Sequence, residues 1–397
     1  MRILAFAYAC EPGEGSEPGA GWAWARMLAG MGETWVITRA NNKASIESVL
    51  PHTPEQRNLH FIYVDLPAWA RFWKKGRRGI YAYYVLWQFA ALRRARELCI
   101  SNDLDLVWHL TLTTVWIGSV GGSVGPPFVY GPIGGGVRVP TGSSSVLGMR
   151  GTLSEAIRTT VSTAARHLNP LARRAWRGAS IILVQNDETR NWLPRTSHPK
   201  IEVMPNVVLT EIPPTRERSR ATSAHTALFA GRLLPWKGAA LAIEAMHWLP
   251  DWDLLIAGDG SDRRRLERLV DRMDLAQRVT FLGAVPRPEI LRLMREEADV
   301  FLFPSLREEA GWVVSEAVSS GVPAVCLDRG GPRELGAIAV PFSTKEATAE
   351  DLAQGVRQLA GSTIPAPPFD IDTRAQMLPE LLSRHGLIPT PTGTRCL

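Results

Sequence analysis

The chain has 397 residues, of which 45% are hydrophobic and 21% charged, and its formal net charge is +6. This composition indicates a globular protein of two domains, because single cores of this size are uncommon. No apolar run reaches the roughly 18–20 residues that span a bilayer. The four cysteines lie far apart and without metal-binding spacing, so we expect neither disulfides nor structural zinc.

The positive charge is concentrated in the first half of the chain. Residues 1–210 hold 23 Lys and Arg against 14 Asp and Glu (+9), whereas residues 211–397 hold 22 against 25 (−3). Such a bias suits an anionic membrane surface, a phosphorylated acceptor or solubility alone.

The first predicted elements are a buried strand over residues 3–9, a glycine-rich loop and a helix. A helix that begins after such a loop can bind phosphate through its backbone N–H groups. The dinucleotide fingerprint is not met, because Pro18 or Trp24 stands where its third glycine would fall. No small-residue cleavage site follows the apolar start, so we expect a strand of a cytoplasmic protein and no signal peptide.

Strands are predicted over residues 34–40 and 59–66, and the chain then becomes aromatic and basic over residues 69–96. This pattern favours an amphipathic helix that docks on the sheet with its basic end in solvent. The alternative is an interfacial helix that contacts an anionic membrane, chiefly through residues 71–78, since aromatic anchors beside cations are typical of such helices.

A strand predicted over residues 104–110 ends at His109, on the edge of the sheet where ligands of α/β proteins bind. A single histidine without further context is more often a core or surface residue. Asp103 and Asp105 form a D-x-D pair, but they stand at the start of this strand and not at its ligand end. We therefore interpret them as loop acids.

Another apolar strand, within residues 127–136, ends in closely spaced glycines that allow close backbone approach at a cleft or hinge. A helical, arginine-rich segment over residues 150–177 and strands over 179–187 and 200–208 follow. The Pro, Ser, Thr and charge content of residues 205–224 is typical of an interdomain linker.

The second half opens with a short strand that leads into Gly231, Arg232 and Lys237. Two cations at the start of a helix can neutralise a diphosphate, Arg as a fork and Lys as a point charge. Taken alone, they would be ordinary surface cations. Further strands are predicted over residues 253–260 and 279–290.

Residues 300–305 are a continuous apolar run, which predicts a strand covered on both faces. Glu308 and Gly311 follow in a loop, and Glu316 lies in the next helix. Two carboxylates spaced in this way could bind hydroxyls at two points of one ligand, a sugar at one end and a ribose at the other. An isolated pair of this kind would be solvated acids at a helix entry.

Two glutamates separated by seven residues, a G-x-P turn, an apolar strand and GGPRE occur in order over residues 308–334, and G-R-L-x-x-x-K-G precedes them at 231–238. These motifs resemble the family 4 retaining glycosyltransferases. The resemblance implies that Glu308 holds the donor sugar, that Glu316 holds the ribose, and that Arg232 and Lys237 bind the diphosphate. Glu309 and Ala310 depart from the family, which usually has Gly-Phe there.

The resemblance implies an α/β GT-B fold: two Rossmann-like, doubly wound domains facing across a cleft, with the acceptor in the first and the donor in the second. We predict a first domain over residues 1–208, a linker over 209–224, a second domain over 225–372, and a C-terminal helix and tail over 373–397, the helix of this fold usually crossing back to the first domain. The implied catalytic residues are His109, Arg232, Lys237 and Glu308, with His109 near the donor sugar. The implied donor-binding residues are Gly19, Gly21, Gly231, Arg232, Lys237, Gly311, Trp312, Val313 and Glu316, and Gly134, Gly135 and Gly136 are assigned to the acceptor side.

The implied reaction moves a sugar from a nucleoside-diphosphate sugar to a hydroxyl with retention of configuration, without a metal or other cofactor. We expect the acceptor to be a lipid-linked sugar, a glycan or a small molecule, in polysaccharide, glycolipid or glycosylated-metabolite biosynthesis. The expected location is cytoplasmic, and no nucleic-acid partner is expected. Peripheral contact with the anionic inner face of a membrane is the alternative that the basic first half leaves open. The alternatives are a nucleotide-sugar epimerase and a non-catalytic sugar-binding protein of the same fold.

Overall fold

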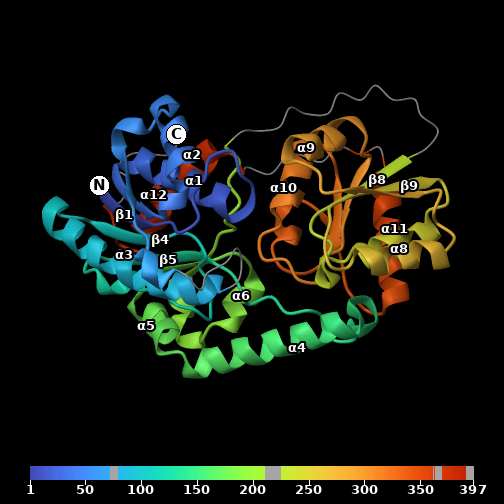
Figure 1. The fold of residues 1–397 in the computed structure, drawn as a ribbon, viewed down its shortest axis with the longest axis horizontal. Coiled ribbons are helices and arrows are strands. Elements are labelled where there is room, and N and C mark those ends of the chain that lie inside the picture. Colours follow the sequence, from blue (N-terminus) through green and yellow to red (C-terminus); the bar gives the residue numbers. More distant parts are fainter. Residues whose placement is uncertain (72–78, 211–224, 361, 363–368, 390–397) are drawn as a thin grey trace, which may run out of the picture. The chain divides into compact units, whose positions relative to one another are not determined.

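The computed structural model describes residues 1–71, 79–210, 225–360, 362 and 369–389 (Figure 1). The chain forms two compact units. Unit 1 comprises Met1–Gly136, Ser162–Thr210 and Phe369–Leu397, and unit 2 comprises Val137–Val161 and Glu211–Pro368. No helix within the described ranges is both long enough and apolar enough to cross a membrane.

Unit 1 is built on a seven-stranded parallel sheet with the strand order β3-β2-β1-β4-β5-β6-β7. The order changes direction between β1 and β4, which is the arrangement of a doubly wound α/β domain. Its strands are β1 (Arg2–Phe6), β2 (Glu33–Thr38), β3 (Leu59–Tyr63), β4 (Leu106–His109), β5 (Phe128–Ile133), β6 (Ile181–Val184) and β7 (Ile201–Val203). Its helices include α1 (Ser16–Met31), α2 (Lys43–Val49), α3 (Ile80–Asn102), α5 (Pro170–Gly178), α6 (Asp187–Trp192) and α12 (Ile371–Arg384).

Helix α3 supplies an aromatic part of the unit 1 core. Tyr83, Tyr84 and Trp87 are fully buried, and the rings of Tyr84 and Trp87 each meet the Tyr8 ring edge-on with centroids 5.2 Å apart. These contacts agree with the interpretation of this stretch as a helix that docks on the sheet. The cationic residues 72–78 lie outside the described part of the chain, so membrane contact through residues 71–78 remains a prediction.

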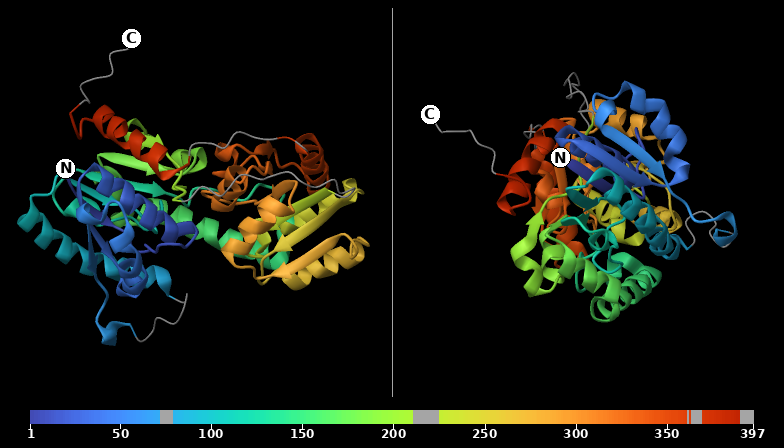
Figure 2. Two further views of the ribbon diagram at one scale, coloured as in Figure 1. Left: turned by 90° about the horizontal axis from the view of Figure 1, so that it is seen from above. Right: turned by 90° about the vertical axis from the view of Figure 1, so that its left-hand side faces the viewer.

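The last described helix, α12, belongs to unit 1. It packs against α1, beside which it is drawn in red in Figure 2. Leu209 pairs with Asp370 in a parallel bridge, and the Nε2 atom of His385 lies 2.9 Å from a carboxylate oxygen of Glu202. The chain therefore returns to its first unit after completing the second.

Unit 2 is a six-stranded parallel sheet with the order β10-β9-β8-β11-β12-β13, which changes direction between β8 and β11. In Figure 1, α9 and α10 lie on one side of this sheet and α8 and α11 on the other, while α7 packs against α8 and α11. The strands are β8 (His225–Ala230), β9 (Trp252–Ala257), β10 (Val279–Gly283), β11 (Val300–Phe303), β12 (Ala324–Leu327) and β13 (Ile338–Val340). The helices are α7 (Ala239–Ala245), α8 (Arg263–Arg272), α9 (Arg287–Glu296), α10 (Trp312–Ser319) and α11 (Lys345–Leu359). The predicted fold class, two doubly wound α/β domains, is confirmed.

The predicted domain boundaries need one correction, because residues 137–161 belong to unit 2 and not to the first domain. The Val137 backbone N–H donates to Glu309 at 3.3 Å, and a Cβ atom at Gly151 would lie 2.8 Å from the Pro235 side chain. Helix α4 (Ser144–Leu168) therefore begins in unit 2 and ends in unit 1. Gly148 breaks its first turn with φ 65° and ψ 173°, a conformation that favours glycine.

Candidate functional site

The candidate site lies at the carboxyl edge of the unit 2 sheet, where β8 and β11 are neighbours. These strands pair in parallel, with Ala227 opposite Val300 and Leu228 opposite Phe301. Their following loops, residues 231–238 and 304–311, therefore leave the sheet on the same edge. In doubly wound sheets this reversal of strand order is where ligands bind.

The two loops are joined by their backbones. The Leu306 N–H donates to the Trp236 carbonyl oxygen at 2.9 Å, and the Ser305 hydroxyl donates to the same oxygen at 3.2 Å. Gly238 has φ 78°, and any Cβ atom there would overlap the Pro304 carbonyl oxygen. Close approach of the two backbones thus explains why the last residue of the G-R-L-x-x-x-K-G motif, Gly238, is a glycine.

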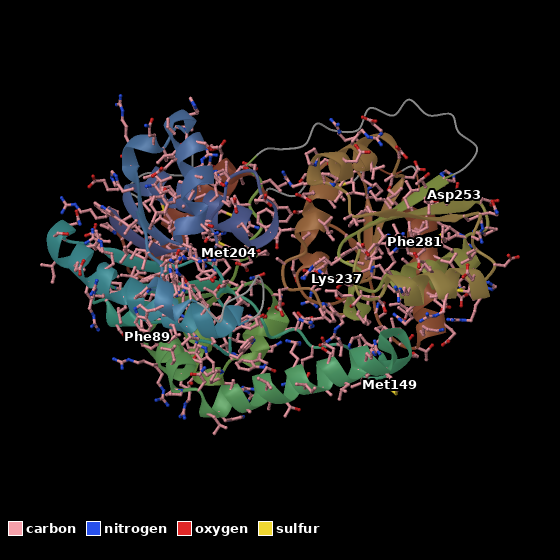
Figure 3. All side chains as sticks on the ribbon, in the orientation of Figure 1. Phe89, Met149, Met204, Lys237, Asp253 and Phe281 are labelled. Carbon is pink, nitrogen blue, oxygen red and sulfur yellow. The ribbon has the colours of Figure 1, made fainter. Side chains whose placement is uncertain are left out.

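Lys237 and Glu308, two of the predicted catalytic residues, meet at this edge. The Lys237 ammonium forms an ion pair with the Glu308 carboxylate, and the same ammonium lies 5.4 Å from the centroid of the Phe303 ring. Both side chains are only partly exposed. Figure 3 labels Lys237 in unit 2. The pair gives the site a cation beside a carboxylate that can accept hydroxyl hydrogen bonds.

Gly231 and Arg232 begin the first of these loops. The Gly231 N–H donates to the Ala257 carbonyl oxygen at 2.9 Å, which holds the loop against the end of β9. The Arg232 residue is exposed and lies on the same loop as Lys237. The loop therefore carries the two cations that were predicted to bind a diphosphate.

Glu316 is buried in α10 and forms an ion pair with Arg287, whose Nε atom lies 2.6 Å from its Oε1 atom. Burial raises the pKa of Glu316, and the neighbouring Arg287 guanidinium opposes this rise. Arg287 begins α9 and is 29 positions away in sequence. No sequence pattern identifies Arg287, since nothing in a single sequence signals that this arginine pairs with Glu316.

Gly311 allows α10 to begin directly after the acidic loop. It is the residue before the helix and has φ 80°, and Trp312 and Val313 form the first positions of α10. A Cβ atom at Gly311 would lie 3.0 Å from the Pro332 side chain. The glycine is therefore required both by its backbone conformation and by close packing.

The GGPRE turn packs against the loop that carries Glu308. A Cβ atom at Gly330 would overlap the Glu308 carbonyl oxygen, and one at Gly331 would lie 2.5 Å from the carbonyl oxygens of Glu309 and Ala310. The Gly331 N–H donates to the Glu308 carbonyl oxygen at 3.3 Å. The GGPRE turn thus fixes the backbone of the loop that carries Glu308.

Residues that no sequence pattern singled out hold the loop from its other side. Arg307 precedes Glu308 and donates to Glu155 of α4 at 2.9 Å, while Glu155 also accepts from Arg158 at 3.1 Å. Glu309, at one of the two positions that depart from the resembled family, accepts the hydrogen bond from Val137 described above. The first part of α4 and the acidic loop therefore form one network within unit 2.

His109 lies in unit 1 at the end of β4 and is fully buried. Its Nε2 atom is 2.8 Å from the Tyr84 hydroxyl and its Nδ1 atom is 2.5 Å from the Ser119 hydroxyl. Burial lowers the pKa of His109 to about 3. In this structure both ring nitrogens of a neutral imidazole are engaged inside unit 1, and the contact of His109 with a donor sugar remains a prediction.

Gly19 and Gly21 lie inside α1, which begins at Ser16 and not after the glycines as predicted. A Cβ atom at Gly19 would overlap the Glu14 carbonyl oxygen, and one at Gly21 would overlap the Ala9 carbonyl oxygen. The two glycines let the helix approach the loop after β1. Their proposed proximity to phosphate or acceptor remains a prediction.

Gly134, Gly135 and Gly136 follow β5 in unit 1. The Gly134 N–H donates to the Thr113 carbonyl oxygen at 3.1 Å. Gly135 has φ 101°, a conformation that favours glycine. A Cβ atom at Gly136 would lie only 2.4 Å from the Thr189 Cα atom, so this position has no room for a side chain. The turn is closely packed, and its acceptor-side role remains a prediction.

The D-x-D pair lies at the amino edge of the unit 1 sheet. Asp103 ends α3 with φ 48°, and the Asp105 carboxylate accepts from the Arg2 backbone N–H at 2.7 Å. The interpretation of both as loop acids before β4 is confirmed. Within the described ranges, no three His, Cys, Asp or Glu side chains are grouped so as to hold a metal ion.

Comparison with known proteins finds a family match that includes the residues of the candidate site. Residues 214–364 match the family described as Glycosyl transferases group 1. The chain is 36% identical over 107 residues to 2-deoxystreptamine glucosyltransferase of Streptomyces kanamyceticus, a match that covers 26% of this chain and 27% of that protein. The chain thus spans less than two thirds of this relative's length.

Solved structures share the fold over almost the whole chain. Sucrose-phosphate synthase from Thermosynechococcus elongatus has a TM-score of 0.59 at 17% identity, and the match covers 96% of this chain and 98% of that one. Anabaena HepE, solved in complex with UDP and glucose, has a TM-score of 0.55 at 18% identity, with 97% and 100% covered. At these identities the likeness shows the fold alone, and that fold is GT-B.

Proposed function

We propose that the chain is a retaining glycosyltransferase of family 4 that uses a nucleoside-diphosphate sugar, because residues 214–364 match the family described as Glycosyl transferases group 1. The observation that carries this proposal is the Lys237–Glu308 ion pair at the carboxyl edge of the unit 2 sheet. It joins a cation suited to a diphosphate with a carboxylate suited to sugar hydroxyls. The motif order that implied both roles lies within the matched residues.

Arg232 and Lys237 offset the negative charge that develops on the departing nucleoside diphosphate. Stabilisation of such charge by fixed cations is usually a large contribution to catalysis. These side chains take the part that a divalent cation plays in metal-dependent transferases, and we therefore propose that the reaction needs no metal. Glu308 accepts hydrogen bonds from the donor sugar, and Glu316, together with Arg287, binds the ribose end.

In the proposed reaction, the bond between the anomeric carbon and the diphosphate oxygen breaks, and the acceptor oxygen bonds to the same carbon from the face that the leaving group vacates. The acceptor proton passes to an oxygen of the departing diphosphate. Configuration is retained, and no side chain serves as a covalent nucleophile.

The proposed acceptor is a hydroxyl of a lipid-linked sugar, a glycan or a small molecule in a cytoplasmic pathway that builds polysaccharides, glycolipids or glycosylated metabolites. The name of one relative, 2-deoxystreptamine glucosyltransferase, supports a small-molecule acceptor within this range. A structural neighbour solved with UDP and glucose supports a nucleotide-sugar donor.

A donor screen tests the proposal. Thermal stabilisation and nucleoside-diphosphate release are measured with a panel of nucleotide sugars, with and without acceptor mixtures, and the anomeric configuration of the product is read by nuclear magnetic resonance. We expect one donor class to stabilise the protein and to give an acceptor-dependent product with retained configuration. Acceptor-independent release of nucleoside diphosphate with a changed sugar would indicate an epimerase, and binding without turnover would indicate a non-catalytic protein.

A further inference from the structure

Three polar side chains meet at the carboxyl edge of the unit 1 sheet, where β1, β2 and β3 are neighbours. Tyr8 comes two residues after β1, Arg39 directly after β2, and Asp65 two residues after β3. Parallel strands end at one edge of a sheet, and ligands of doubly wound domains bind beyond that edge. We name these three residues the edge cluster. They have no role in the transfer reaction as proposed.

Asp65 fixes the position of Arg39 in the edge cluster. The Nε atom of Arg39 donates to an Asp65 carboxylate oxygen at 3.2 Å, and the Tyr83 hydroxyl donates to the same oxygen at 2.8 Å. The second Asp65 oxygen lies 3.8 Å from the Arg71 guanidinium. Together with Arg71, the cluster therefore contains two cations and one carboxylate, so its own residues leave one positive charge unbalanced.

The Tyr8 hydroxyl is an unused hydrogen-bond donor beside Arg39. Tyr8 is 4% exposed, and its buried hydroxyl has no hydrogen-bond partner among the residues that the structure describes. The Arg39 guanidinium carbon lies 5.2 Å from the centroid of the Tyr8 ring. Burial raises the pKa of Tyr8 to about 12, and the Arg39 charge opposes this rise, so the hydroxyl keeps its proton at neutral pH. Buried polar groups without a partner are rare and costly, and a ligand oxygen would satisfy this one.

A second buried arginine of unit 1 forms a complete pair and serves as a comparison. Arg26 donates to Glu55 through two nitrogens, at 2.8 and 3.2 Å. The Arg26 and Arg39 side chains are equally buried, with 16% and 17% exposed. Within the part of the chain that the structure describes, Arg39 donates to Asp65 through its Nε atom alone. Because a guanidinium has five N–H donors, Arg39 retains donors for a ligand that carries several oxygens.

We propose that the edge cluster binds an anionic group, a phosphate or a carboxylate, that the acceptor carries. The terminal nitrogens of Arg39 and the Tyr8 hydroxyl donate to the oxygens of this group, and Arg71 supplies the cation that balances its charge. Hydrogen bonds between charged groups are shorter and stronger than those between neutral ones. The identification of the bound molecule as the acceptor rests on the proposed transfer reaction, whereas anion binding at the edge cluster does not.

The test measures binding of glucose-6-phosphate, glucuronate and glucose to the full chain by calorimetry, without a donor. The two anions distinguish phosphate from carboxylate, and glucose is the neutral reference. Tyr8→Phe removes only the hydroxyl that has no partner. The matched control is Tyr130→Phe, whose hydroxyl donates to the Thr114 carbonyl oxygen at 2.9 Å in the same unit. Denaturant titration gives the free energy of unfolding of each protein.

We expect at least one of the two anions to bind wild type more tightly than glucose does. Tyr8→Phe should weaken this binding roughly tenfold without loss of stability, because the hydroxyl has no hydrogen bond to lose in the free protein. Tyr130→Phe should lose stability and bind the anion like wild type. Equal affinity of wild type and Tyr8→Phe would overturn the proposal, as would the absence of binding of both anions to wild type.

Anions could also bind at the cations of unit 2, so the titrations are repeated with Arg39→Gln, Arg26→Gln and Lys237→Gln. Binding should be lost in the Arg39 variant and kept in the other two. Loss in the Lys237 variant with wild-type affinity in the Arg39 variant would assign the anion to unit 2 and overturn the proposal. A donor screen without turnover, beside Arg39-dependent anion binding, would contradict the transfer reaction alone. Turnover without such binding would contradict the edge-cluster site alone.

Discussion

The Glu155 carboxylate contacts the Arg307 guanidinium at 2.9 Å across 152 positions of the sequence. Glu155 is 3% exposed, and the Arg307 guanidinium also lies 4.8 Å from the centroid of the Trp236 ring. Burial lowers the pKa of Arg307, the Arg158 charge lowers it further, and Glu155 opposes both effects. Arg307 is held between α4 and the loop that contains Lys237, and the next residue is Glu308. We infer that Glu155 and Arg307 are positioning residues for the Lys237–Glu308 pair.

Replacement of Glu155 by Gln should therefore lower both stability and turnover. Loss of one partner from a buried ion pair costs about 3 kcal/mol of unfolding free energy, measured by denaturant titration. We expect kcat to fall by roughly tenfold with a smaller change in the donor KM, because the variant displaces a loop that still contains its own binding groups. Glu267→Gln, which breaks the more exposed pair with Arg263 in the same unit, is the matched control. A loss of stability with unchanged kcat would restrict Glu155 to a structural role.

Glu316→Ala should weaken binding of the donor nucleotide, because it removes the proposed ribose contact and leaves Arg287 without its buried partner. We expect the dissociation constant, measured by calorimetry with the nucleoside diphosphate, to rise by roughly tenfold or more. Glu296→Ala, which removes an exposed carboxylate paired with Arg292 in the same unit, should bind like wild type. Unchanged affinity in the Glu316 variant would remove the ribose assignment.

Transfer activity should persist after dialysis against excess chelator, because Arg232 and Lys237 are proposed to neutralise the diphosphate without a metal ion. Initial rates with and without EDTA, and after readdition of magnesium or manganese, decide this point. A chelated enzyme that is inactive until a divalent cation returns would contradict the proposal.

His109 should make the free energy of unfolding depend on pH. Because burial lowers its folded-state pKa to about 3, below the ordinary value near 6.5, the unfolded chain takes up this proton first as the pH falls. The stability that neutral His109 contributes is therefore complete above about pH 6.5 and is lost as the pH falls toward 3, at up to about 1.4 kcal/mol per pH unit.

The measurement compares wild type with His109→Gln by denaturant titration between about pH 7 and pH 4.5, with the exposed His52→Gln variant as control. The difference between wild type and the His109 variant should shrink as the pH falls. Parallel stability curves for these two proteins would show that His109 is not held neutral by burial.

Much of the fold could be predicted from the sequence, because strands of parallel sheets are covered on both faces and therefore consist of continuous runs of apolar residues. The run over residues 300–305 became β11, and the run ending at His109 became β4. The start of α1 was not predicted, since glycines disfavour helices in isolation. Gly19 and Gly21 are helical here because tertiary packing against the Glu14 and Ala9 carbonyls requires their lack of a side chain.

The candidate site was predictable only in part. Motif order identified Lys237 and Glu308, and the structure brings their side chains together. Arg287 and Glu155 could not be found in the same way, because their roles depend on pairing with residues 29 and 152 positions distant. Residues 137–161 were predicted to lie in the first domain, whereas they belong to unit 2. The composition of a helical, arginine-rich segment does not indicate against which sheet it packs.

The Lys237–Glu308 pair is the centre of the proposed donor site, and the transfer rate of Lys237→Gln tests that assignment directly. The matched control is Lys345→Gln, which breaks an ion pair with Glu244 of 2.8 Å in the same unit, between α11 and α7. With the donor identified by the screen, we expect kcat/KM to fall by at least about 100-fold in the Lys237 variant and to stay within about twofold of wild type in the Lys345 variant. Equal rates for the Lys237 variant and wild type, with both proteins folded, would contradict the placement of the donor site at this edge of the unit 2 sheet.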